Sequence, residues 1–337
     1  MSRKSDLYIS TQTGLFRGTI NASIEGVEPI GFQTEVGTLT PVLIDHKNPD
    51  RLYIGTRRAG MFLSTDRGRT WHARNHGLIY KECWSLVQHP LSGVIFLGTG
   101  PAAVFKSTDY GETWQFCEQL HSMPETIDWT FPNPPHIAHV KGLGLDPHDP
   151  NHVFGAIEEG WLIRSLDAGA TWTTLKSGTD WDSHTVSVMP NDPRVLISTS
   201  GDGVYRSDDG GDTFLPANDG LTRRYCAQLV VHKDEPNVLF TAAAEIPPRG
   251  WSKRPQGADS KFFRSDDQGH SWKELTGGLP DVLKGAPRAT TGRPEKAGSF
   301  LVGTNDGAVW LSDDFGESFK QFALGVPHIY GLTISPN

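Results

Sequence analysis

One short motif recurs six times along the chain, and it constrains the fold more than any other feature of the sequence. Each copy follows the pattern Ser-x-Asp-x-Gly-x-(Ser or Thr)-(Trp or Phe), with copies starting at Ser64, Ser107, Ser165, Ser207, Ser265 and Ser312. An Asp side chain accepts hydrogen bonds from backbone N–H groups of its own turn, and Gly supplies the positive φ that a tight turn needs. The terminal aromatic ring can fold back as an apolar plug. The motif therefore predicts six hairpin turns in which the Asp has a structural rather than a catalytic role.

A second pattern lies upstream of the motif and consists of two strand-like runs joined by a turn that contains proline. Residues 42–56 show it around Pro49, and residues 144–153 and 188–195 repeat it around Pro150 and Pro193. Together with the runs that flank the hairpin motif, each repeat supplies four antiparallel strands in roughly 45 residues. Four-stranded repeats of this size are typical of the blades of a β-propeller.

The six motifs resemble the Asp-box, or BNR repeat, of sialidases, xyloglucan-cleaving glycosidases, sortilin-like receptors and a photosystem II assembly factor. The chain is most similar to propellers with WD40-, YVTN- or BNR-like repeats. This resemblance covers nearly the whole chain, and it implies an all-β propeller in which each Asp-box joins the third and fourth strands of a blade. It implies no single activity, because that group contains both enzymes and non-enzymes.

The two ends of the sequence predict how the ring closes. Beyond Asp314 and before Asp66 there is room for two blade steps, so one blade lacks the motif. Residues 329–337 read as an inner strand with a proline turn, and residues 6–17 match a second and a third strand. We therefore predict one seven-bladed domain over residues 1–337, closed by a blade split between 1–34 and 328–337. The other blades are assigned to residues 35–80, 81–120, 136–180, 181–222, 223–280 and 284–327.

Composition narrows the classes of partner and location. The formal net charge is −8 and no run of Lys and Arg stands out, so nucleic acid and anionic membranes are poor candidate partners. Three cysteines without CxxC spacing favour neither a disulfide framework nor a cysteine zinc site. We see no apolar leader and no 18-residue apolar stretch, so we expect a cytoplasmic protein without a membrane span.

Alignment of the repeats indicates where a ligand site should lie. The inner strands begin with polar residues such as His139 and Asp182 and turn aliphatic further along, as at Leu143 and Val186. This change is typical of a pocket mouth above a packed core. Two insertions, residues 121–136 and 245–260, are rich in Trp and Pro, and we expect them either to cover this mouth or to be surface decoration.

His139, Glu158 and His184 come from adjacent blades and are expected to converge. Two imidazoles and a carboxylate suit a divalent metal, and they suit metal-free acid–base chemistry equally well. A solvated polar rim without a ligand is the alternative. The candidate catalytic set is His139, Glu158, His184, Asp182 and Tyr225, and His139, Glu158 and His184 are the candidate metal ligands.

Aromatic and basic residues near the same mouth could bind a substrate, because aromatic faces stack on sugar rings and a carboxylate pair would complete a glycosidase. The alternative for these Trp residues is packing between blades. A classical sialidase is disfavoured, because no Phe-Arg-Ile-Pro segment is present and no arginine spacing requires the sialidase triad. The candidate substrate-binding residues are Arg57, Arg58, Trp84, Lys141, Trp181, Arg224, Trp251, His328 and Tyr330.

Two functions remain open at the level of sequence. The first is an enzyme that acts on a small polar, carbohydrate-like substrate by hydrolase or lyase chemistry, with a divalent metal as an optional cofactor. The inward-facing His and Glu residues favour it, since a scaffold does not need them. The second is a non-catalytic propeller that binds a ligand or assembles proteins. The lack of a complete known catalytic signature favours that second function.

Overall fold

The hairpin motifs and proline turns produce seven antiparallel sheets, the blades of an all-β, seven-bladed β-propeller. The structure is a computed structural model, and it describes residues 5–32, 36–232 and 234–336. Helix is almost absent from these residues, which contain only the short 3-10 helices η1 (Glu118–Ser122), η2 (Pro124–Ile127) and η3 (Pro248–Lys253). The predicted fold class and number of blades are confirmed.

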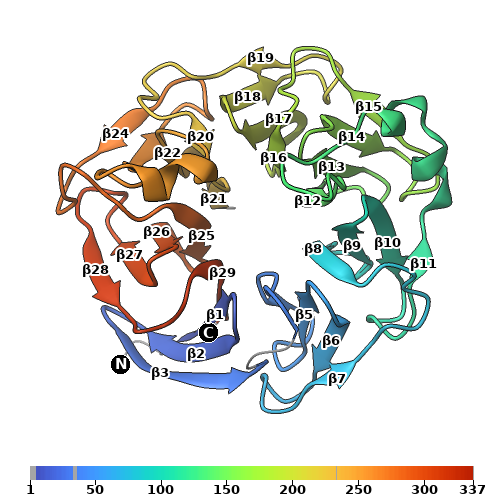
Figure 1. The fold of residues 1–337 in the computed structure, drawn as a ribbon, viewed down its shortest axis with the longest axis horizontal. Coiled ribbons are helices and arrows are strands. Elements are labelled where there is room, and N and C mark those ends of the chain that lie inside the picture. Colours follow the sequence, from blue (N-terminus) through green and yellow to red (C-terminus); the bar gives the residue numbers. More distant parts are fainter. Residues whose placement is uncertain (1–4, 33–35, 233, 337) are drawn as a thin grey trace. The chain divides into compact units, whose positions relative to one another are not determined.

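One sheet is built from both ends of the sequence, with the strand order β29-β1-β2-β3. Its strands are β29 (Ile329–Ile334), β1 (Ser5–Thr11), β2 (Leu15–Ile20) and β3 (Ile24–Gly31). Figure 1 shows β29 beside β1, and the register pairs Leu7 with Ile334 and Ile9 with Leu332. These apolar residues are buried in one cluster together with Ile329. The predicted closure of the propeller by a split blade is thus confirmed.

The other six sheets each follow one stretch of sequence. The first contains β4 (Leu43–Ile44), β5 (Leu52–Thr56), β6 (Gly60–Ser64) and β7 (His72–Ala73). The second contains β8 (Glu82–Gln88), β9 (Ile95–Gly100), β10 (Ala103–Ser107) and β11 (Gln115–Phe116). The third contains β12 (Val140–Leu145), β13 (Val153–Ile157), β14 (Leu162–Ser165) and β15 (Thr173–Leu175). The fourth contains β16 (Ser183–Met189), β17 (Asp192–Ser200), β18 (Gly203–Ser207) and β19 (Leu215–Pro216). The fifth contains β20 (Tyr225–Cys226), β21 (Val230–His232), β22 (Glu235–Ala244), β23 (Lys261–Ser265) and β24 (Lys273–Leu275). The sixth contains β25 (Pro287–Arg293), β26 (Lys296–Thr304), β27 (Ala308–Ser312) and β28 (Lys320–Ala323).

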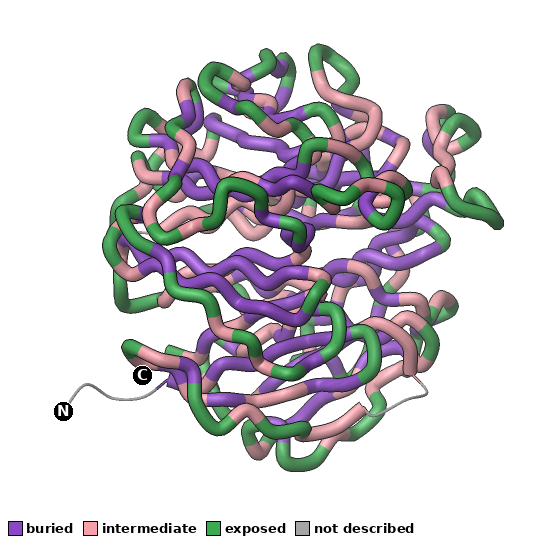
Figure 2. Tube along the Cα trace, turned by 60° about the vertical axis from the view of Figure 1, so that its left-hand side comes forward, coloured by how far each residue is buried: buried purple, intermediate pink, exposed green. Residues whose placement is uncertain are grey.

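Contacts between residues divide the chain into two compact units. The first unit contains the strands β1 to β3, residues 199–204 and the chain from residue 217 onward. The second unit contains the remaining described residues, including the sheets from β4 to β15. Buried residues concentrate in the strands and exposed ones in the connecting loops, and Figure 2 colours the chain by burial. No helix of the described residues is long and apolar enough to cross a membrane.

The six Asp-boxes share one hydrogen-bond pattern that explains their residue types. In each box the Ser hydroxyl donates to an Asp oxygen at 2.7–2.8 Å and accepts the Gly N–H at 2.8–2.9 Å. The second Asp oxygen accepts the hydroxyl of the following Thr or Ser at 2.5–2.7 Å. The closing aromatic ring is buried in five boxes and half-buried at Trp71. The structural role predicted for the box Asp agrees with this network.

The turn inside each box contains one more residue with positive φ than the sequence pattern predicts. Two successive residues have positive φ, namely the box Gly and the variable residue before it. That variable residue is Ala168 with φ +55° in the third box, whereas the fourth box has Gly210 with φ +81°. A non-glycine residue in this conformation carries a cost of about 1 kcal/mol. Five boxes accept that cost, because their hydrogen bonds fix the turn.

Candidate functional site

Among the inner strands whose register the structure describes, four carry a β-bulge at the same position of the blade repeat. In β8 the register shifts between Cys83 and Ser85, and in β12 it shifts between Val140 and Gly142. The same shift occurs in β25, and where β29 pairs with β1. A bulge leaves one extra residue in the strand and redirects its side chain. The extra residues are Trp84, Lys141, Arg288 and Tyr330.

His139, Glu158 and Lys141 form a buried charged group at one end of the β12–β13 pair. The backbone N–H of Glu158 donates to the His139 carbonyl at 3.4 Å, which places the two side chains side by side. Glu158 Oε2 accepts His139 Nε2 at 2.8 Å, and Glu158 Oε1 accepts Lys141 Nζ at 2.8 Å. The side chains of His139 and Glu158 are only 1% and 10% exposed, so Lys141, at 24%, is the member that solvent reaches most easily.

Asp182 and His184 extend this group from the next blade. His184 Nε2 lies 3.3 Å from Asp182 Oδ1, and the side chains are 4% and 32% exposed. The blades are tied beside them, because Gly160 N–H and Trp161 N–H donate to the Trp181 carbonyl at 3.0 and 3.2 Å. The structure therefore brings together four predicted side chains, with Lys141 as their cationic partner. We call His139, Lys141, Glu158, Asp182 and His184 the His–carboxylate cluster.

Burial and neighbouring charge together set the pKa values of His139, Glu158 and Asp182. Burial lowers the pKa of His139 to about 4, although the Glu158 carboxylate opposes this shift, so His139 is neutral at pH 7. Burial alone would raise the pKa of Glu158, but the Lys141 ammonium and the His139 imidazole outweigh it and hold the pKa well below its usual range. Burial acts likewise on Asp182, where the hydrogen bond and charge of His184 prevail and lower the pKa. Both carboxyl groups are therefore ionised at neutral pH.

The cluster has a donor set that fits a divalent cation only in part. Glu158, Asp182 and His184 each place one ligand atom within 4.8 Å of the other two. Nitrogen and oxygen donors of this kind suit zinc or a similar ion. The sequence predicted His139 as the third ligand, but Asp182 takes its place in this group. The Nε2 atom of His139 is not available, because it is hydrogen-bonded to Glu158. Both oxygens of Glu158 already accept hydrogen bonds, so a cation would have to displace Lys141.

Trp84 does not offer a free face for a sugar ring, contrary to the sequence-based expectation. Its ring centroid lies 3.2 Å from that of His139 in a stacked arrangement, and Arg57 Cζ lies 3.4 Å from the ring centroid. Two groups at such distances cannot share one face, so they cover both. Phe131, from the insertion 121–136, packs edge-on against His139 at 4.8 Å. Trp84 and Arg57 therefore belong to the packing that fixes His139, and Phe131 is a contact residue that the sequence did not reveal.

The insertion 121–136 lies against the turn that carries Glu158. Thr130 N–H donates to the Glu159 carbonyl at 3.1 Å, and a Cβ at Gly160 would meet the Trp129 ring at 2.8 Å. On this side Trp161 and Trp181 meet edge to face at 4.2 Å. Trp181 is half-buried by this contact. The insertion thus covers part of the His–carboxylate cluster, as one of the two expectations from sequence proposed.

The remaining predicted residues are described within their own units. Arg58 is exposed in the second unit, beyond the end of β5. In the first unit, Tyr225 packs edge-on against Trp251 at 6.2 Å, and Arg288 lies over both Trp251 at 4.6 Å and Tyr330 at 5.7 Å. This aromatic group holds an arginine that was not among the predicted substrate-binding residues, although its place in the repeat matches that of Lys141. Arg224 and His328 are exposed in that unit.

Comparisons with known proteins support the repeat and the fold. The family model described as BNR/Asp-box repeat matches residues 62–73. A xyloglucanase of Hypocrea jecorina is 25% identical over 51% of this chain, and a xyloglucanase of a Paenibacillus species is 34% identical over 22% of it. The chain spans 20% of the length of the first relative and 9% of the second.

Two solved structures illustrate the similarity of the fold. An ancestral GH74 enzyme superimposes with a TM-score of 0.65 at 18% identity, over 85% of this chain and 38% of that one. A structure described as YCF48 bound to D1 peptide superimposes with a TM-score of 0.59 at 15% identity, over 91% of this chain and 86% of that one. At such low identity these likenesses concern the fold alone.

Proposed function

We propose that this seven-bladed Asp-box propeller is an enzyme that acts on a small polar, sugar-like substrate at its His–carboxylate cluster, by hydrolase or lyase chemistry. One observation carries the proposal. Asp182 Oδ1 and His184 Nε2 lie 3.3 Å apart, and Asp182, at 32%, is the most exposed side chain of the cluster, whereas His184 is buried at 4%. A carboxylate next to an imidazole is the usual pair for moving a proton near neutral pH.

The cluster divides into a reacting part and a supporting part. Asp182 is ionised and partly exposed, so it can meet the substrate and stabilise positive charge on His184 while that imidazole takes or gives a proton. Lys141 can bind a hydroxyl or a developing negative charge through its exposed side. His139 and Glu158 were predicted as catalytic, but their burial and mutual bonding suit positioning residues that hold Lys141 in place.

A sugar-like substrate is supported by two facts. Relatives of this chain include xyloglucanases, although each matches only a part of its length here. The cluster also offers a hydroxyl-rich ligand both acceptors, at Asp182, and a donor, at Lys141. Glu158 is held ionised by Lys141 and His139, so we assign the role of acid to His184 instead.

A metal-assisted reaction is a variant of this proposal, and a test must distinguish it from the metal-free reaction. Glu158, Asp182 and His184 would hold the cation, which would supply an activated water at neutral pH. The ammonium group of Lys141 opposes that arrangement by its charge. We therefore favour the metal-free reaction.

A non-catalytic binding module is the second candidate function. The ionised and fully hydrogen-bonded Glu158 favours it, since such a group contributes little to turnover. The structural neighbour with a bound D1 peptide gives an example of a propeller that binds a peptide. A ligand would then bind at the same cluster without being converted.

The experiment is an activity screen of the purified protein with 4-nitrophenyl glycosides and xyloglucan oligosaccharides. Asp182→Asn and His184→Gln should each lower kcat/KM by about 10²-fold or more if they serve acid–base chemistry. His72→Ala is the control, because His72 is exposed on the outer strand β7. Unchanged rates in both variants would refute the assignment. Binding without turnover would favour the module, and loss of activity in EDTA would favour the metal.

A further inference from the structure

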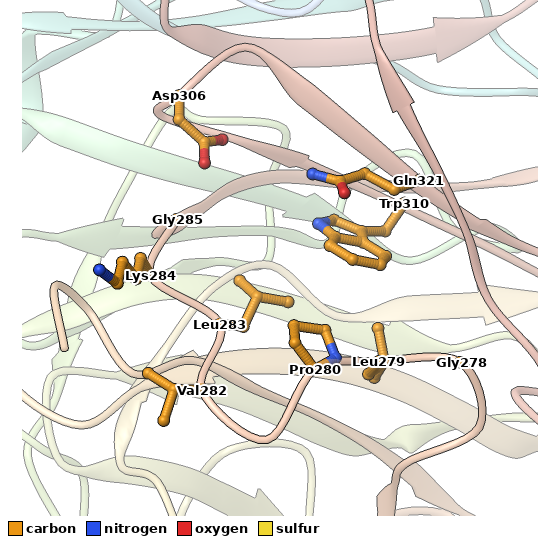
Figure 3. A pocket seen from close by; sticks show the side chains of 10 residues that line it. All are labelled: Gly278, Leu279, Pro280, Val282, Leu283, Lys284, Gly285, Asp306, Trp310 and Gln321. Atoms are coloured by element: carbon orange, nitrogen blue, oxygen red, sulfur yellow. The ribbon is translucent and has the colours of Figure 1, made fainter.

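A cavity of about 560 Å³ lies in the first unit, where the segment before β25 faces the outer strands of the same blade. We propose that it binds one neutral sugar ring. Its walls include Trp310, Gln321, Asp306 and Lys284, and Figure 3 shows these side chains around the opening. None of them belongs to the His–carboxylate cluster, so this proposal does not rest on the proposed reaction.

The apolar side of the cavity is rigid. Trp310 is 7% exposed and packs in a core cluster with Phe300 and Leu283, so its indole ring is fixed in place. Leu279 and Pro280 continue the apolar wall beside it. Leu279 and Pro280 therefore supply most of the accessible apolar surface for the C–H groups of a sugar, and the fixed edge of the indole ring backs them at little entropic cost. Trp310 thus has a packing role in the core cluster as well as a place in the wall of the cavity.

The polar side offers both donors and acceptors. Gln321 on β28 pairs directly with Trp310 on β27, so the carboxamide stands next to the indole on the same face of the sheet. Asp306 accepts a hydrogen bond from the Thr304 hydroxyl in the β26–β27 turn. A Cβ at Gly285 would lie 2.9 Å from Asp306 Oδ2, so the glycine lets this carboxylate approach the opposite segment. Figure 3 shows the indole nitrogen turned toward the side of Asp306.

The balance of charge selects the class of ligand. Asp306 and Lys284 are both exposed at the rim and contribute opposite charges, so neither an anion nor a cation gains a net attraction. Hydroxyl groups both donate and accept, and a carboxylate, a carboxamide and an ammonium group can bond several of them. Cavities of this size are typical of small-molecule sites. A neutral ring with several hydroxyl groups fits these features better than a charged ligand does.

The test uses the methyl pyranosides of glucose, galactose, mannose and xylose as probes. Saturation-transfer NMR should detect at least one of them on the full chain, and titration calorimetry should give its Kd. Gln321→Ala and Asp306→Asn should each weaken that binding about five- to tenfold, because each removes one or two hydrogen bonds. Both side chains are exposed, so the melting temperature should stay unchanged. Lys320→Ala, the neighbouring exposed residue of β28, should have no effect.

Two outcomes would overturn the proposal. One is that none of the four glycosides binds at millimolar concentration. The other is that a glycoside binds equally well to the Gln321 and Asp306 variants. Loss of the activity proposed above, with intact glycoside binding here, would leave this site unaffected.

Discussion

Individual residues of the Asp-box show how a short motif fixes a turn. The box Gly and the residue before it both have positive φ, and only the fourth box has Gly at both places. A Cβ at Gly210 would meet no atom within 4 Å, whereas one at Gly211 would lie 3.0 Å from Leu175 and 3.0 Å from Leu196. The two neighbouring glycines therefore have different reasons to be glycine. The first only avoids strain, and the second also makes room for the core.

Substitution of these two glycines should separate strain from packing. Gly210→Ala should lower the free energy of unfolding by about 1 kcal/mol, the cost of a left-handed non-glycine residue. Gly211→Ala should cost clearly more, because the same strain is joined by contact with two buried leucines. Urea unfolding of both variants measures the difference. Equal losses in the two variants would contradict this account.

Strands are the scale at which the split blade is stabilised. Strand β29 places Ile329, Leu332 and Ile334 into the buried cluster of the first unit. Ser335, the residue after β29, is hydrogen-bonded to β1. Its N–H donates to the Asp6 carbonyl at 2.9 Å, and its Oγ accepts the Asp6 N–H at 2.9 Å. The strand therefore contributes both apolar burial and the pairing that covers the edge of β1.

Removal of residues 329–337 should abolish stable folding. Burial of three aliphatic side chains is worth about 5–8 kcal/mol, which is comparable with the whole net stability of a typical domain. Circular dichroism and size-exclusion chromatography should show aggregation or a large fall in melting temperature. Removal of residues 336–337 alone is the control, because the bonds of Ser335 remain. A normal melting temperature after the longer deletion would be incompatible with closure through β29.

At the scale of the whole molecule, the sequence predicted the fold better than the site. The six boxes and the split ends act through local turn chemistry and strand pairing, so a repeat pattern is enough to find them. Repeat alignment also placed His139, Glu158 and His184 near one another. It did not predict that Trp84 would be covered by His139 and Arg57, or that Lys141 would bind Glu158. Both follow from bulges and from contacts between blades, which strict alternation along a strand does not contain.

The six boxes together should make the molecule sensitive to acid. Hydrogen bonds hold the pKa of every box Asp below its usual range, to about 2 at Asp66, Asp209 and Asp267. Since the folded-state pKa is the lower one, this stability is present above about pH 4 and is lost as the pH falls toward 2. The urea midpoint should be similar at pH 7 and pH 5 and much lower at pH 2.5.

A matched variant tests whether the boxes cause this acid sensitivity. Asp109→Asn should lower the urea midpoint at pH 7, and it should lose less on acidification than the unmodified protein does, because one titrating group is gone. Thr108→Ala, at an exposed position of the same box, should behave like the unmodified protein. A midpoint that is the same at pH 2.5 and pH 7 would exclude this explanation.

The shared bulge has a consequence for how such a chain can change. Each bulge places a different chemical group at the same position of the blade repeat, namely Trp84, Lys141, Arg288 and Tyr330. The next residue is small each time: Ser85, Gly142, Ala289 and Gly331. Because the extra residue stands outside the pairing ladder, it can be exchanged without turning the apolar residues below it away from the core. Exchange at Arg288 or Tyr330 therefore leaves the pairing ladder unchanged, whereas exchange at Trp84 or Lys141 also removes a contact to His139 or Glu158. Libraries that vary Arg288 and Tyr330 would explore new specificities while the hydrogen-bonded frame of each blade stays the same.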